Sequence, residues 1–101
     1  MTIDPEAVVD RTHRRWVDDI EPALHRYIEV PALSVAFDPD WEAHGHLDRV
    51  VADAAAWAEG CAIAGLEVEV VRLPGRTPIL WFDVPAFGDA APADDQVLLY
   101  G

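Results

Sequence analysis

The chain has 101 residues, of which 51% are hydrophobic and 26% are charged. This is the composition of a folded domain and not of a disordered tail. Seven basic residues oppose 19 acidic ones, which gives a net charge of −12. That charge repels the phosphates of nucleic acids and of anionic membranes, so neither is expected as a partner.

The N-terminus and the apolar runs of the chain indicate its compartment. The first residues are charged and include no apolar signal segment, and no apolar run reaches the roughly 18 residues of a membrane span. The single cysteine, Cys61, excludes a disulfide within the chain and a CxxC zinc site, and we expect a small buried side chain there. These features predict a cytoplasmic protein.

A long helix is expected first. Asp4 can cap its free amide groups, and Pro5 suits the first helical position. Apolar residues then recur every three or four positions as far as Ile28, as they do along one face of a helix. Pro22 removes an amide bond inside this pattern and is expected to kink or restart the helix. Pro31 ends it, because the residue before a proline avoids the helical conformation.

A second helix is expected after an ordered loop over residues 31–40. Asp38 or Asp40 can cap this helix. From Trp41 to Cys61 the apolar residues again recur at intervals of three and four, and alanines on that face would permit close packing. The sequence therefore predicts one helix from Trp41, whose end is bracketed by Gly60 and Gly65.

The C-terminal third shows strand patterns. Apolar and acidic residues alternate from Leu66, which predicts a β-hairpin with strands at about 66–73 and 79–84 around a proline-glycine turn. A polar loop follows over residues 86–95. Residues 96–100 carry four consecutive bulky apolar side chains, which predicts a strand covered on both faces, as in an α/β sheet. Two helices supply too little cover, so exposed apolar surface and unpaired edges are expected.

Three segments, in this order, resemble parts of zinc-dependent dipeptidases and aminoacylases, and most closely the dipeptidases related to carnosinase. Residues 27–34 (YIEVPALS) resemble the hydrophobic-x-Ile-Pro-Ser-Val-Ser segment after the first helix of that family. Residues 70–78 (VVRLPGRTP) are similar to its first hairpin, and residues 95–101 (DQVLLYG) look like the strand that leads into its metal site. The resemblance implies that residues 1–101 are a single incomplete domain, the N-terminal part of an α/β catalytic domain.

The resemblance also implies a reaction for the full-length enzyme. Members of this family hydrolyse the amide bond of dipeptides or N-acyl amino acids with two zinc ions and a carboxylate base. A His-x-Asp zinc motif would be the next element after Gly101. No residue of this chain matches a zinc ligand or the catalytic glutamate, so we assign no catalytic, metal-ligating or substrate-binding residue and expect the chain alone to be inactive without bound zinc. Its expected partner is the remainder of the catalytic domain.

One segment imitates the zinc motif. His46-Leu47-Asp48 spells His-x-Asp, and His44 adds His-x-His. The segment lies in or beside the predicted second helix, where side chains two apart point about 200° away from each other. We therefore predict that it holds no metal, although an extended backbone would place His44, His46 and Asp48 on one face.

An alternative function needs no catalysis. A small acidic α+β module could bind a protein partner by pairing its exposed strand with that partner. It would be a monodisperse chain that unfolds cooperatively, whereas a segment of a larger domain would aggregate or stay molten.

Overall fold

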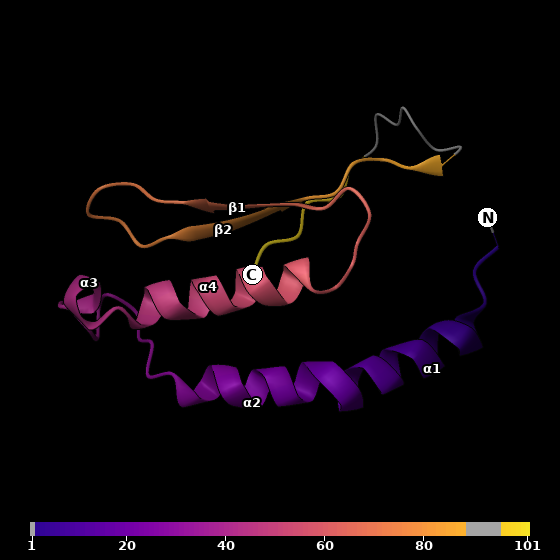
Figure 1. Cartoon of the computed structure of the whole chain (residues 1–101), viewed down its shortest axis with the longest axis horizontal. Coiled ribbons are helices and arrows are strands. Elements are labelled where there is room, and N and C mark those ends of the chain that lie inside the picture. Colours follow the sequence, from indigo (N-terminus) through magenta and orange to yellow (C-terminus); the bar gives the residue numbers. More distant parts are fainter. Residues whose placement is uncertain (1, 89–95) are drawn as a thin grey trace. The chain divides into compact units, whose positions relative to one another are not determined.

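The computed structural model describes residues 2–88 and 96–101. They belong to two compact units, Met1–Val50 and Val51–Gly101. The described residues form a small α+β fold with a 25-residue helix, a short and a longer helix, and one antiparallel hairpin (Figure 1). The structure confirms that the chain folds into helices followed by a β-hairpin.

The long helix begins and ends as predicted. The Asp4 Oδ1 atom accepts bonds from two amides of the first turn, at 3.1 and 3.4 Å, and caps α1 (Pro5–Arg15). The last part of the helix is α2 (Glu21–Glu29). Val30 then takes an extended backbone (φ −80°, ψ 120°) because it precedes Pro31.

Between α1 and α2 the helix is wider. The stretch η1 (Trp16–Ile20) is π-helical, and the amide of Glu21 donates to the carbonyl of Trp16, five residues earlier. Pro22 follows at the start of α2. In a regular α-helix its ring would clash with the carbonyl of Asp18, and the wider turn accommodates a residue that has no amide. The predicted disturbance at Pro22 is thus a local change of helix type.

The second predicted helix is broken. A short helix, α3 (Trp41–His44), is separated from α4 (His46–Glu59) by Gly45, which has a left-handed backbone (φ 72°, ψ 6°). The Gly45 amide closes α3 by donating to the Trp41 carbonyl at 3.1 Å. The predicted second helix is therefore two helices, because a glycine in this conformation ends a helix. The end of α4 at Glu59, directly before Gly60, agrees with the prediction.

The hairpin consists of β1 (Glu67–Val71) and β2 (Ile79–Asp83), which pair antiparallel. Both strands lie within the predicted ranges, and β1 ends two residues before the predicted position. Residues directly opposite each other include Glu67 with Asp83 and Glu69 with Trp81. Side chains alternate between the two faces of a strand, so these four side chains share one face.

Residues 96–101 form no strand. The side chains of Val97–Tyr100 are between 77% and 100% exposed. The prediction of a buried strand at 96–100 is therefore wrong for the described chain. A strand needs a neighbour that bonds its backbone groups, and in the described chain neither β1 nor β2 bonds these residues. The predicted loop 86–95 falls mostly on residues 89–95, which lie outside the described residues.

The buried interior of the described chain is small. Val50 and Ala58, both in α4, are its buried hydrophobic residues. Many large apolar side chains are exposed by contrast, in both units. Among the described residues, no helix is both long and apolar enough to cross a membrane.

Candidate functional site

The segment that imitates the zinc motif is helical. His46, Leu47 and Asp48 form the first turn of α4, which confirms the conformation on which we rejected a metal site there. Within residues 2–88 and 96–101, no group of three or more His, Cys, Asp or Glu side chains could hold a metal ion. The residues that the structure describes therefore do not fit a zinc site.

His44 takes part in a different contact, with a loop carboxylate. Its Nδ1 atom lies 2.8 Å from Oδ2 of Asp38, and the side chain of Asp38 is only 11% exposed. The hydrogen bond that His44 donates to Asp38, and then the charge of Asp38, raise the pKa of His44 above the ordinary 6.5, and the charge of Asp40 adds to this effect. The His46 ring lies 5.9 Å from the His44 ring, between centroids. The result is a protonatable imidazole held by a carboxylate.

The loop itself fixes the position of Asp38. The carbonyl of Ser34 accepts bonds from the amides of Phe37 and Asp38, at 2.8 and 3.0 Å, and the amide of Trp41 donates to the Asp38 carbonyl at 3.2 Å. Sequence reasoning missed the pair of Asp38 and His44, because these residues are six positions apart and meet only through the turn into α3. The sequence predicts Asp38 or Asp40 only as a helix cap. Asp40 stands at the cap position of α3 and makes no side-chain cap bond.

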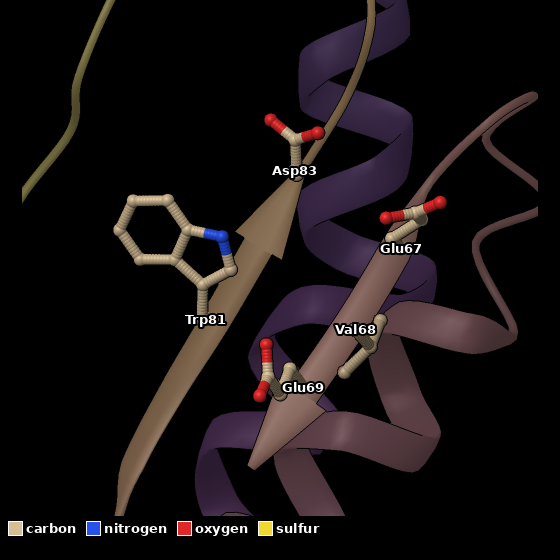
Figure 2. Close-up of a pocket in the computed structure, with 5 residues that line it drawn as sticks. All are labelled: Glu67, Val68, Glu69, Trp81 and Asp83. Carbon is tan, nitrogen blue, oxygen red and sulfur yellow. The ribbon is translucent and has the colours of Figure 1, made fainter. Parts of the chain in front are cut away.

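A shallow pocket lies on the hairpin. Figure 2 shows the side chains that line it, from Glu67, Val68 and Glu69 of β1 and from Trp81 and Asp83 of β2. We name the shared face of Glu67, Glu69, Trp81 and Asp83 the acidic–aromatic face. The alternation of residues in the sequence predicts a solvent-exposed face for β1. The pairing register, which the structure supplies, shows which residues of β2 lie opposite the glutamates of β1.

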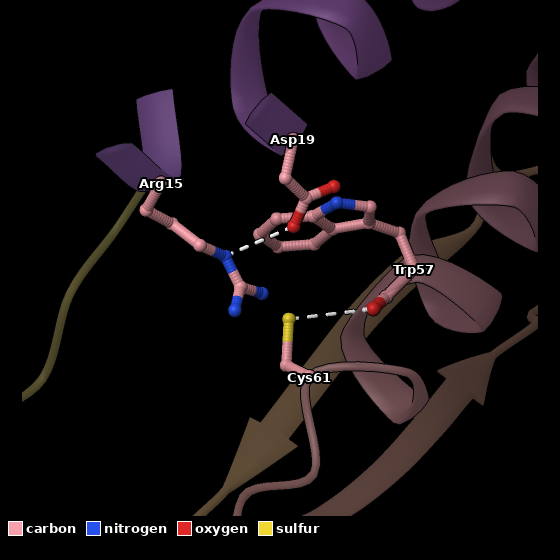
Figure 3. Close-up of polar contacts among 4 residues, drawn as sticks. All are labelled: Arg15, Asp19, Trp57 and Cys61. Atoms are coloured by element: carbon pink, nitrogen blue, oxygen red, sulfur yellow. Dashed lines mark hydrogen bonds and ion pairs between the residues drawn. The ribbon is translucent and has the colours of Figure 1, made fainter. Parts of the chain in front are cut away.

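Two further polar contacts are local (Figure 3). Arg15 Nε lies 2.9 Å from Oδ2 of Asp19, one helical turn away, where both side chains are partly exposed. The Cys61 thiol donates to the carbonyl of Trp57 at 3.4 Å. Cys61 is half-buried beyond the end of α4, so the expected full burial in a helix is wrong. Each contact joins residues four positions apart in the same segment.

Comparison with models of known protein families and with curated proteins yields no match for this chain.

Proposed function

We propose that this chain is the N-terminal segment of the catalytic domain of a two-zinc peptidase, which hydrolyses amide bonds in dipeptides or N-acyl amino acids. The observation that carries this proposal is the order of three segments that resemble that family, at 27–34, 70–78 and 95–101. The first covers the end of α2 and the loop after it, and the second contains the turn between β1 and β2.

The exposure of apolar side chains supports the proposal. Leu98 and Leu99 are 77% and 89% exposed, and Val50 and Ala58 are the buried hydrophobic residues of the described chain. Full burial of one leucine or valine side chain contributes about 1.5–3 kcal/mol. Further strands of a larger sheet would provide this burial, and would give residues 96–100 the neighbours that a strand requires.

The role of this segment in such an enzyme is structural. Because the described residues do not fit a zinc site, the metals and the carboxylate base would be held by other residues of the domain. The long helix and the hairpin would form part of the layered domain. Residues 96–101 would become the strand that leads towards the metals, since ligands in open α/β sheets bind beyond the carboxyl ends of strands.

The test is to express the reading frame that encodes these residues together with everything that follows Gly101. We expect a His-x-Asp motif directly after Gly101, the remaining ligands further on, and zinc-dependent hydrolysis of dipeptides or N-acyl amino acids. The 101-residue chain alone is expected to show no hydrolysis. A frame that lacks these ligands refutes the proposal. Tight binding of two zinc ions by the 101-residue chain, with dipeptide hydrolysis, would refute the expected inactivity of this chain.

A second candidate is an acidic interaction module without catalysis. Its support is the net charge of −12 together with a two-stranded hairpin that has no third strand among the described residues. Sedimentation and unfolding of the 101-residue chain separate the two candidates. A monodisperse chain with a cooperative transition supports the module, and an aggregating or molten chain supports the catalytic-domain segment.

A further inference from the structure

We draw no further inference here: the strongest candidate, the shallow pocket on the acidic–aromatic face of the hairpin, is lined by exposed carboxylates beside the half-exposed Trp81, and no second observation in the described chain points to a ligand for it.

Discussion

Gly65 lies just before β1 and offers a quantitative test of the packing in the hairpin unit. Its backbone is left-handed (φ 76°), and a Cβ atom at this position would lie 3.1 Å from Cγ and 3.2 Å from Cδ of Pro85. In Gly65→Ala the left-handed backbone costs about 1 kcal/mol. Contact with the exposed Pro85 ring adds about 1 kcal/mol, the low end of the cost of overpacking. We therefore expect the opening free energy of the hairpin to fall by about 2 kcal/mol.

The measurement is hydrogen exchange of the β1 and β2 amides, which reports local opening even where global unfolding is not cooperative. Gly75→Ala is the matched control, since Gly75 is also left-handed (φ 71°) but a Cβ there would meet nothing within 4 Å. It is expected to lose only the backbone contribution of about 1 kcal/mol. Replacing Pro85 by alanine is expected to bring Gly65→Ala close to the control value. Equal losses for Gly65→Ala and Gly75→Ala would refute the contact with Pro85.

Three further predictions concern the N-terminal unit. Asp38→Asn is expected to lower the pKa of His44, because the variant removes the strongest hydrogen bond and charge acting on the imidazole, and Asp40→Asn is expected to lower it less. The pKa of His44 is raised in the folded chain, so the stability that this contact gives the loop is fully present below pH 6.5. That stability is lost as the pH rises through the pKa of the folded chain. An NMR titration of the His44 ring would measure this pKa. Asp4→Ala removes the cap of α1 and is expected to cost about 1 kcal/mol, seen as faster exchange of the first-turn amides. Pro22→Ala restores a backbone N–H group and removes the proline ring, so we expect η1 to become α-helical. Carbon chemical shifts would report this change. A π-helix that persists in the variant would show that Pro22 is not its cause.

The features that were predicted correctly from the sequence are local ones. The Asp4 cap acts on the amides of its own first turn, and Pro31 acts on the residue directly before it. The alternation of apolar and acidic residues from Leu66 indicates the two faces of a strand, and this pattern does not depend on contacts with the rest of the chain. Gly45 was missed because a glycine inside an apolar pattern is compatible with a continuing helix, and its left-handed backbone appears only in the structure.

The polar contacts show the same limit. His46 and Asp48 cannot act together as metal ligands if their segment is helical, because side chains two apart on a helix point in different directions. The apolar pattern predicts that helix, and the structure has it. The pair of His44 and Asp38 needed the fold of the intervening turn, and no pattern in the sequence encodes a contact across six residues there. The pairing of Glu67 with Asp83 likewise depends on the register of two strands, which a period of two leaves open.

Residues 96–100 show what a local pattern leaves out. The apolar composition of Val97–Tyr100 favours a covered strand, yet a strand forms only when a neighbour bonds its backbone. The sheet of the described chain consists of β1 and β2, and neither strand bonds these residues. Further strands of a larger sheet would bond this segment and cover its apolar side chains, as the peptidase proposal requires.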